Sequence, residues 1–247
     1  MKITQPKIAS LDPSWTVFRG ASVLAHPLGK ARAADDQTPR GGRHAVRLYD
    51  GLTDLMGQVD GADWRDRFGF CPLPAASYHL TLADLVNDGN LGKLPEADRA
   101  HFGGERVAQG SEYPAGLVEI VERSGILSVP IPRVRFTVRA VEILNRSALA
   151  ATLDFVDDET GVLSAFIEAR DDLAVRLHHR FGVQMQPYKP HISLGYFANP
   201  EAADAAVEAV ARLNLKAEAL FDGRAFQFDG PDVFVFADMA TFWPHRA

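Results

Sequence analysis

The sequence predicts an α+β fold with two similar lobes, and two observations support this prediction. Each half of the 247-residue chain yields the same order of expected elements: strand, helix, histidine-bearing strand, helix, strand. Residues 133–144, "RVRFTVRAVEIL", alternate apolar and polar side chains, as a strand does when one face of its sheet is buried. We therefore expect sheets covered by helices on one face, in a single domain over residues 1–247. Its lobes would span roughly residues 15–144 and 145–247, and elements could exchange between them.

The first lobe begins after a polar, proline-containing segment, residues 1–14, which we expect to be an arm or loop. Residues 15–26, "WTVFRGASVLAH", are rich in β-branched and aromatic side chains and predict a strand. Residues 45–59 and 115–127 place apolar side chains at helical spacing and predict amphipathic helices. Between these helices, a proline-punctuated loop leads into a strand at residues 77–85, "SYHLTLADL".

The second lobe repeats this order with clearer boundary signals. Gly182 is placed to end a long helix as its C-terminal cap, and Asn199 with Pro200 is placed to begin another. The expected elements are a strand at 148–156, a helix at 159–182, a strand at 191–197, a helix at 200–215, and a pair of strands or a bent hairpin within 225–239.

The composition limits the classes of function. Hydrophobic residues make up 47% and charged residues 23%, as in an ordinary globular protein. The net charge of −6 argues against a broad nucleic-acid surface, although it leaves room for a local pocket that binds one phosphate. The single Cys71 excludes an internal disulfide and a cysteine metal cage. Because no signal peptide or membrane-length apolar run is present, we expect a cytoplasmic protein without membrane contact.

Two stretches carry a polar pair on an otherwise apolar strand. In "SYHLTLADL", His79 and Thr81 share one face of the strand because side chains alternate with a period of two. In "PHISLGYF", residues 190–197, His191 and Ser193 do the same. Each stretch follows a proline-containing loop and occupies the same place in its half of the chain. We expect both polar pairs to point into the space between the lobes.

Two imidazoles and two hydroxyls in one cleft suit phosphate-ester chemistry. One imidazole takes a proton from water or a hydroxyl, and the other gives a proton to the leaving oxygen, so in-line displacement needs no metal. Hydroxyl groups donate hydrogen bonds to the non-bridging oxygens, where charge builds up. We therefore expect His79 and His191 to be catalytic, Thr81 and Ser193 to bind phosphate, and neither a metal nor a cofactor to be needed.

At these residues the chain resembles the two-histidine (2H) phosphoesterase superfamily, in which two His-x-Thr/Ser motifs lie one in each lobe of a bilobal α+β fold. "YHLTL" and "HISLGYF" match this pattern, and "FRGASVLAH" followed by "PLPAASYHLTL" looks most like an uncharacterised bacterial branch. Relatives include 2'-5' RNA ligase-like proteins, RNA 2',3'-cyclic phosphodiesterases and ADP-ribose cyclic phosphodiesterases. The resemblance implies a pseudo-symmetric fold, with two antiparallel sheets facing a central cleft and helices outside. It also implies the same roles for the four motif residues.

Five further residues are candidates for the lining of the cleft. Parity along the strands places the small Ala83 and Gly195 beside the motifs, where they would leave room for a ligand. Phe197 has the same parity and could line the cleft, but its place at the end of the strand favours a core aromatic. Tyr188 could stack on a base or could be a packed loop tyrosine. His26 could reach the site from the end of its strand.

The function we expect is hydrolysis of a cyclic phosphate or 2'-5' phosphodiester in a nucleotide or short RNA end. The alternative is a module that binds a nucleotide in the same cleft without turnover. Ligation of RNA ends ranks lower because of the acidic net charge. No basic cluster flanks either motif, so we expect a small nucleotide or oligonucleotide end as partner, bound by a monomer. A long loop at residues 88–114 could cover or narrow the cleft.

Overall fold

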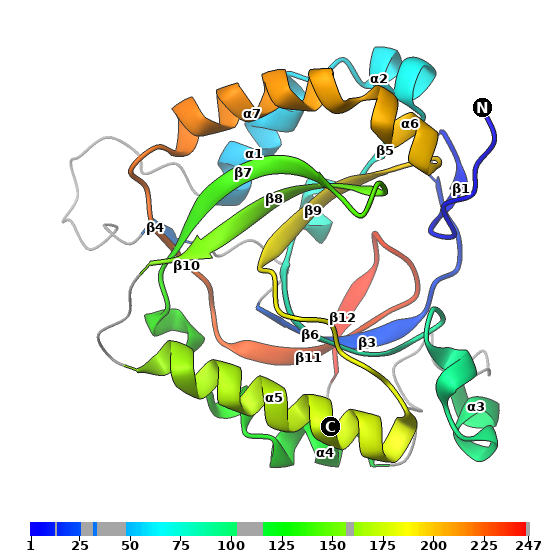
Figure 1. Ribbon diagram of the computed structural model, residues 1–247, viewed down its shortest axis with the longest axis vertical. Coiled ribbons are helices and arrows are strands. Elements are labelled where there is room, and N and C mark those ends of the chain that lie inside the picture. Colours follow the sequence, from blue (N-terminus) through cyan, green and yellow to red (C-terminus); the bar gives the residue numbers. More distant parts are fainter. Residues whose placement is uncertain (13, 26–31, 34–47, 103–115, 157–160, 246–247) are drawn as a thin grey trace.

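Two antiparallel sheets lie face to face, with helices on their outer sides (Figure 1). The computed structural model describes residues 1–12, 14–25, 32–33, 48–102, 116–156 and 161–245. Every strand pairing among these residues is antiparallel. The predicted α+β class and the arrangement of helices outside facing sheets are therefore confirmed.

The described elements fall into three kinds. The strands are β1 (Ile8–Ser10), β2 (Ser14–Trp15), β3 (Gly20–Ala25), β4 (Arg32–Ala33), β5 (Phe70–Pro72), β6 (Leu80–Asn87), β7 (Phe136–Leu144), β8 (Ala148–Phe155), β9 (His191–Phe197), β10 (Phe226–Gln227), β11 (Pro231–Phe236) and β12 (Phe242–Pro244). The helices are α1 (Leu48–Gly57), α2 (Gly61–Phe68), α3 (Glu96–Phe102), α4 (Leu117–Arg123), α5 (Val162–Phe181), α6 (Pro200–Ala205) and α7 (Val207–Phe221). Short 3₁₀ turns are η1 (Ala75–Ser77), η2 (Leu91–Lys93), η4 (Ile126–Ser128) and η5 (Ile131–Arg133).

Both main sheets combine strands from the two halves of the sequence. The larger sheet has the order β4-β10-β7-β8-β9-β5, and the smaller has the order β12-β11-β3-β6. Helices α1, α2, α6 and α7 lie over the larger sheet, while α4 and α5 lie under the smaller one (Figure 1). The apolar side chains between helices and sheets form one buried cluster. Strand β6, which directly follows His79, and strand β9, which begins at His191, belong to different sheets and contact each other.

Most of the predicted elements are present, with the caps where the sequence indicated them. Gly182 follows α5 with a φ of 69°, a left-handed conformation that favours glycine. Asn199 caps α6, where its side-chain oxygen accepts a hydrogen bond from the Ala202 amide at 2.8 Å. Residues 225–239 contain a pair of strands, as one of the two alternatives predicted, and the hairpin alternative is wrong, because β10 pairs in the larger sheet and β11 in the smaller. The chain passes from one sheet to the other there.

Helix α2 was missed because its apolar pattern is weak. Its eight residues bury only Trp64 and Phe68. The local signals lie at its ends, where the Asp60 side chain accepts from two backbone amides and Gly69 adopts a φ of 53°. Among the residues that the structure describes, no helix is both long and apolar enough to cross a membrane.

The N-terminal arm is docked against the end of β9 rather than left as a free loop. It contains β1 (Figure 1), which pairs with β2 directly after it in the chain. The amides of Thr4 and Gln5 both donate to the Ala198 carbonyl, at 2.8 and 3.0 Å. The Asn199 side chain donates to the Lys2 carbonyl at 2.6 Å. These bonds hold the arm beside the end of β9.

An irregularity interrupts β6 directly after the first motif. Leu24 of β3 lies opposite Thr81, but the preceding Val23 lies opposite Ala83, so Leu82 is an extra residue on its strand. Such a β-bulge shifts the alternation of side chains by one position. Ala83 therefore faces the helices and is 1% exposed within the core. The prediction that Ala83 lines the cleft is wrong for this reason.

The same irregularity follows the second motif in β9. Ala150 of β8 lies opposite Ser193, but Leu149 lies opposite Gly195, so Leu194 is the extra residue. Gly195 consequently faces the larger sheet's helix side, together with the buried Leu149. A Cβ built on Gly195 would lie 2.6 Å from Cε2 of Phe70 and 2.7 Å from the Cys71 carbonyl oxygen. Gly195 is thus required by close packing, and its predicted place in the cleft is wrong.

This packing predicts that Gly195→Ala destabilises the protein. We expect a loss of about 2 kcal/mol or more in the free energy of unfolding, because overpacking a filled core has this order of cost. The matched control is Gly57→Ala, at the end of α1, where a Cβ would meet no atom within 4 Å. Urea denaturation of both variants measures the difference. Equal stability of Gly195→Ala and wild type would contradict this assignment of the bulge.

A candidate active site between the two sheets

The structure brings the two predicted catalytic histidines together from equivalent places in the two sheets. His79 immediately precedes β6, and His191 is the first residue of β9. The two imidazoles are near enough that the charge of His191 disfavours the protonated form of His79. The two histidines are far apart in the sequence, and the contact of β6 with β9 brings them close together in the fold.

Both imidazole rings are held in the same way. Nδ1 of His79 lies 2.7 Å from the Ser77 carbonyl oxygen, and Nδ1 of His191 lies 2.8 Å from the Lys189 carbonyl oxygen. In each case the acceptor is the carbonyl two residues earlier in the chain. Because a carbonyl only accepts, each Nδ1 must carry the proton, and in the neutral ring Nε2 then carries the lone pair. Each histidine therefore presents Nε2 as its reactive atom.

The surroundings of His79 favour its neutral form. Burial lowers the pKa of His79 to about 4, well below its usual range, and the positive charges of His191 and Lys7 act in the same direction. The hydrogen bond to Ser77 and the carboxylate of Asp84 oppose this shift without overcoming it. The ring packs on Phe242, with ring centroids 4.5 Å apart. His79 is therefore a neutral imidazole at pH 7.

The two motif hydroxyls also share a common situation. Thr81 and Ser193 are both half-buried, and their strand partners Leu24 and Ala150 lie on the faces directed between the sheets. Within the part of the chain that the structure describes, neither hydroxyl and neither histidine Nε2 has a hydrogen-bond partner. Four polar groups are thus available to a ligand. Such a set can accept and donate protons and can bind the oxygens of a phosphate.

The two bulges bring residues to this space that strict alternation would have excluded. After Leu82 the next inward residue is Asp84, which accepts a hydrogen bond from the Ser22 hydroxyl at 3.3 Å and influences His79. After Leu194 it is Tyr196, whose hydroxyl lies 3.2 Å from Nζ of Lys7. Alternation from the histidines had pointed to Ala83 and Gly195 instead. The motif spacing carries no signal for a bulge, so these residues could not be found from it.

Arg170 of α5 supports both motifs from behind. Its Nε donates to the Leu82 carbonyl at 3.1 Å, which is the carbonyl of the bulge residue, and its Nη2 donates to the Gln186 carbonyl at 2.7 Å. The residue is only 9% exposed, and burial lowers the pKa of its guanidinium. In the sequence it occupies the apolar stripe of the helix, between Phe166 and Leu173. An arginine at a core-facing position was the signal that could have identified it.

The other predicted lining residues lie elsewhere. Tyr188 packs between Phe155 and Phe166, with ring centroids 6.0 and 5.0 Å away, so it is the packed loop tyrosine that was the alternative. Burial raises the pKa of the Tyr188 hydroxyl. Phe197 is fully buried against Phe70, because the bulge at Leu194 also reverses its parity. It is the core aromatic that the sequence favoured, and its candidate place in the cleft is wrong. His26 lies outside the described residues.

The described part of the 88–114 segment is tied to the end of α5. It forms η2 and α3, and the Asp98 carboxylate of α3 accepts from two nitrogens of Arg180 at 2.6 and 2.9 Å. The remaining residues of this segment, 103–114, lie outside the described residues.

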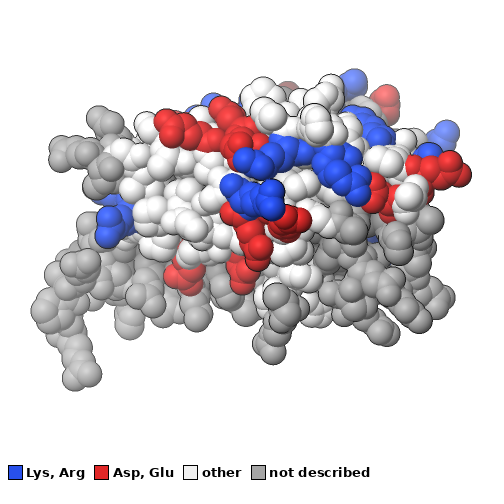
Figure 2. Space-filling view, turned by 90° about the horizontal axis from the view of Figure 1, so that it is seen from below, with Lys and Arg blue, Asp and Glu red and all other residues white. Residues whose placement is uncertain are grey.

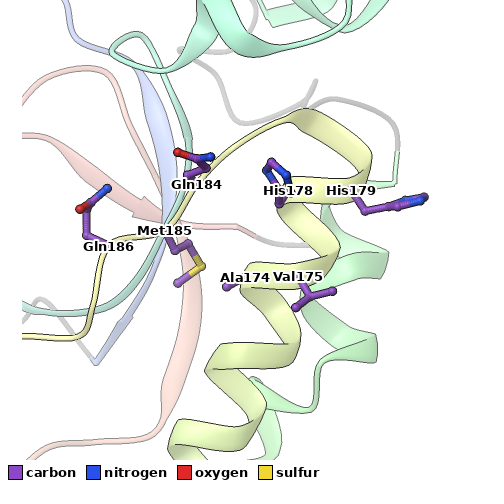
Figure 3. Close-up of a pocket in the computed structure, with 7 residues that line it drawn as sticks. All are labelled: Ala174, Val175, His178, His179, Gln184, Met185 and Gln186. Atoms are coloured by element: carbon purple, nitrogen blue, oxygen red, sulfur yellow. The ribbon is translucent and has the colours of Figure 1, made fainter.

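Two hollows open on the surface along α5, away from the motif residues. One, of about 700 Å³, lies between the helix and the segment of Gln184, Met185 and Gln186 (Figure 3). The other, of about 480 Å³, lies between α4 and α5. Neither is lined by the four motif residues. We place the candidate site at the histidines, because the reactive groups are there.

The face below the smaller sheet carries basic and acidic side chains side by side (Figure 2). Arg123 pairs with Glu119 on α4 at 2.6 Å, and Arg176 pairs with Asp172 on α5. This mixture of signs is unlike the continuous basic surface that binds extended nucleic acid. Among the described residues, no cluster of three His, Cys, Asp or Glu side chains is arranged to hold a metal ion.

Comparison with known proteins shows a fold shared with a solved structure from Agrobacterium tumefaciens. No family model matches the chain, and no curated protein matches it in sequence. A crystal structure of a conserved protein of unknown function from Agrobacterium tumefaciens is 14% identical, with 95% of this chain and 88% of that chain covered, at a TM-score of 0.52. LigT from E. coli is 14% identical, with 94% of this chain and 96% of that chain covered, at a TM-score of 0.43. A structure described as a phosphoesterase is 12% identical, with 93% and 99% covered, at 0.42.

The lowered pKa of His79 predicts a specific loss of stability in acid. The unfolded chain takes up a proton on this residue as the pH falls through about 6.5, whereas the folded chain does so only near 4. Between these values the unfolded state binds more protons and is favoured, while above pH 6.5 the residue contributes nothing to the pH dependence. Chemical denaturation at pH 7 and at pH 4.5 measures the free energy of unfolding at each pH. Its decrease from pH 7 to pH 4.5 should be larger for wild type than for His79→Gln. An NMR titration of His79 with a midpoint near 6.5 would refute this.

The position of Arg170 predicts that Arg170→Met lowers the free energy of unfolding by at least about 2 kcal/mol, because two enclosed carbonyls lose their donors. Arg176→Met on the same helix is the control, because its ion pair with Asp172 is exposed to solvent and such pairs contribute little to stability. Chemical denaturation of the two variants compares them directly. If both lose the same amount, Arg170 does not hold the two segments together.

Proposed function

We propose that this chain is a metal-independent phosphoesterase of the two-histidine type. Its substrate would be a cyclic phosphate or a 2'-5' phosphodiester in a small nucleotide or a short RNA end. The observation that carries the proposal is the matched geometry of His79 and His191. Each donates Nδ1–H to the carbonyl two residues earlier and leaves Nε2 unpartnered among the described residues. Each is followed two residues later by a hydroxyl that is also unpartnered there.

The different surroundings of the two histidines suggest their roles in hydrolysis. Because His79 is neutral at pH 7, it is suited to be the general base that takes a proton from the attacking water on Nε2. The water oxygen then forms a bond to phosphorus while the bond from phosphorus to a ribose oxygen breaks. His191, protonated on both nitrogens, would give its Nε2 proton to that leaving oxygen. The Lys189 carbonyl accepts Nδ1–H throughout and stabilises the charged ring.

The hydroxyls of Thr81 and Ser193 would bind the non-bridging phosphate oxygens. Negative charge on these oxygens increases as water attacks, so hydrogen bonds from fixed donors become stronger in the transition state. Both hydroxyls are carried by strands rather than by loops. The bonds that hold the two bulges keep these strands in place. The site is therefore organised before the substrate arrives.

A nucleotide-binding module without turnover is the second candidate function. The unpartnered hydroxyls of Thr81 and Ser193 would serve it equally well. Binding without turnover would leave unexplained why two histidines present the same reactive nitrogen from equivalent positions. The mixed charges on the face below the smaller sheet give no support to an extended nucleic-acid ligand for either function.

Turnover of adenosine 2',3'-cyclic monophosphate should persist in EDTA and fall at least about 10²-fold in His79→Ala and in His191→Ala, the usual range for loss of a general acid or base. His178→Ala is the control, because His178 lies at a surface hollow on α5. Activity is followed by chromatography of the product nucleotide.

Three outcomes would reject the enzymatic mechanism. They are loss of activity in EDTA, unchanged activity in both site variants, and an equal loss in the His178→Ala control. Calorimetric binding of the nucleotide without product from any cyclic or 2'-5' substrate would favour the binding module.

A further inference from the structure

A half-buried cation lies beside the candidate site without a carboxylate partner. Nζ of Lys7 lies 3.2 Å from the Tyr196 hydroxyl, 4.8 Å from the centroid of the Tyr196 ring and 5.1 Å from the centroid of the Phe18 ring. Among the described residues, no carboxylate lies within ion-pair distance of it. An ammonium group has three protons to donate, and only the bond with Tyr196 uses one. The others are available to an anion.

The fold holds Lys7 in this position through its backbone. The Thr16 amide donates to the Lys7 carbonyl at 3.1 Å, and the Thr16 hydroxyl donates to the Pro6 carbonyl. The next residue, Ile8, is buried in the core. Since the amides of Thr4 and Gln5 also bind the Ala198 carbonyl, both sides of Lys7 are anchored. The cation is therefore part of a built surface, unlike an exposed lysine on a loop.

A continuous aromatic wall connects Lys7 to His79. Phe18, which lies under the Lys7 ammonium, stacks on Phe236 with ring centroids 6.3 Å apart. Phe236 contacts Phe242 at 5.3 Å, and Phe242 packs on His79 at 4.5 Å. The charge of Lys7 also disfavours the protonated form of His79. Lys7 thus belongs to the same wall of the site as the proposed base.

Lys7 contacts β9 at Tyr196, which is too far along the strand for Lys7 to reach the phosphate that reacts. Ser193, the proposed ligand of that phosphate, precedes Tyr196 by three residues, which corresponds to about 10 Å along a strand. A nucleotide whose cyclic phosphate lies between the histidines would reach Lys7 only with a group remote from the reacting bond. An ammonium group that has no carboxylate partner among the described residues favours a negative charge there.

We propose that Lys7 binds a second phosphate group of the substrate, so that the preferred substrates are cyclic or 2'-5' phosphodiesters that carry an additional phosphate away from the scissile bond. Tyr196 is a positioning residue, because its hydroxyl and ring hold the ammonium in place. This inference rests on the proposed phosphoesterase function. It adds a class of substrate that the two motifs do not specify.

The first test compares adenosine 2',3'-cyclic monophosphate with the same compound bearing a 5'-phosphate. Wild type should have a kcat/KM at least about 10-fold higher for the 5'-phosphorylated compound, the factor that a charge-assisted hydrogen bond contributes. Lys7→Gln should reduce this ratio to about one, and Lys7→Arg, which retains the charge, should preserve most of it. Lys216→Gln, on the exposed face of α7, should leave the ratio unchanged.

The second test measures binding without turnover. Calorimetry should show that wild type binds adenosine 2',5'-bisphosphate more tightly than adenosine 2'-monophosphate, and that Lys7→Gln binds the two equally. If Lys7→Gln lowers the melting temperature and reduces the affinity for both ligands by the same factor, Lys7 has a structural role and the inference is wrong.

The proposed phosphoesterase function and the inference about Lys7 can be refuted separately. If the histidine variants lose activity while Lys7→Gln keeps the full 5'-phosphate preference, only the inference about Lys7 is refuted. If wild type neither binds nor converts any of these compounds, both proposals are refuted.

Discussion

An extra residue in each of two strands, Leu82 in β6 and Leu194 in β9, decides which side chains face the space between the sheets. Each bulge lies directly after a His-x-Thr/Ser motif, so the histidine and hydroxyl point inward, as alternation predicts, while the residues beyond them are reversed. A bulge also leaves backbone groups without their regular sheet partners, and these groups must be satisfied within the fold. Arg170 binds the Leu82 carbonyl, and the Leu73 amide binds the Leu194 carbonyl at 2.9 Å. The site geometry therefore depends on side chains and strands that never touch its interior.

The repeated backbone does not make the two halves of the site chemically equal. The first bulge turns the carboxylate of Asp84 inward, whereas the second turns the phenol of Tyr196 inward, with Lys7 bound to it. His79 packs against Phe242, and burial suppresses its protonation. The backbone around the two imidazoles is similar, but the charged and aromatic groups around them differ. The neutral state of His79 is the reason why we propose it as the general base and His191 as the general acid.

The site is assembled from segments that are far apart in the chain. The N-terminal arm supplies Lys7, the two motifs lie in different sheets, and β12 near the C-terminus supplies Phe242. Arg170 joins the bulge after the first motif to the segment before the second. Both main sheets take strands from both halves of the sequence, so neither motif has a complete environment within its own half. Contacts of this range form only when the whole fold is complete.

The sequence by itself determined the class of fold, most elements, and the pairs His79 with Thr81 and His191 with Ser193, because helical and strand periodicity are local properties of the chain. It also contained the capping signals of Gly182 and Asn199. Alternation failed beyond Thr81 and Ser193, and it placed Ala83 and Gly195 on the wrong face. A bulge arises from the pairing of two strands and has no signature in one strand alone. Only the tertiary structure decided that Asp84, Tyr196, Lys7 and Arg170 surround the motifs. Their roles depend on burial and on charges brought together across the fold, which no local pattern encodes.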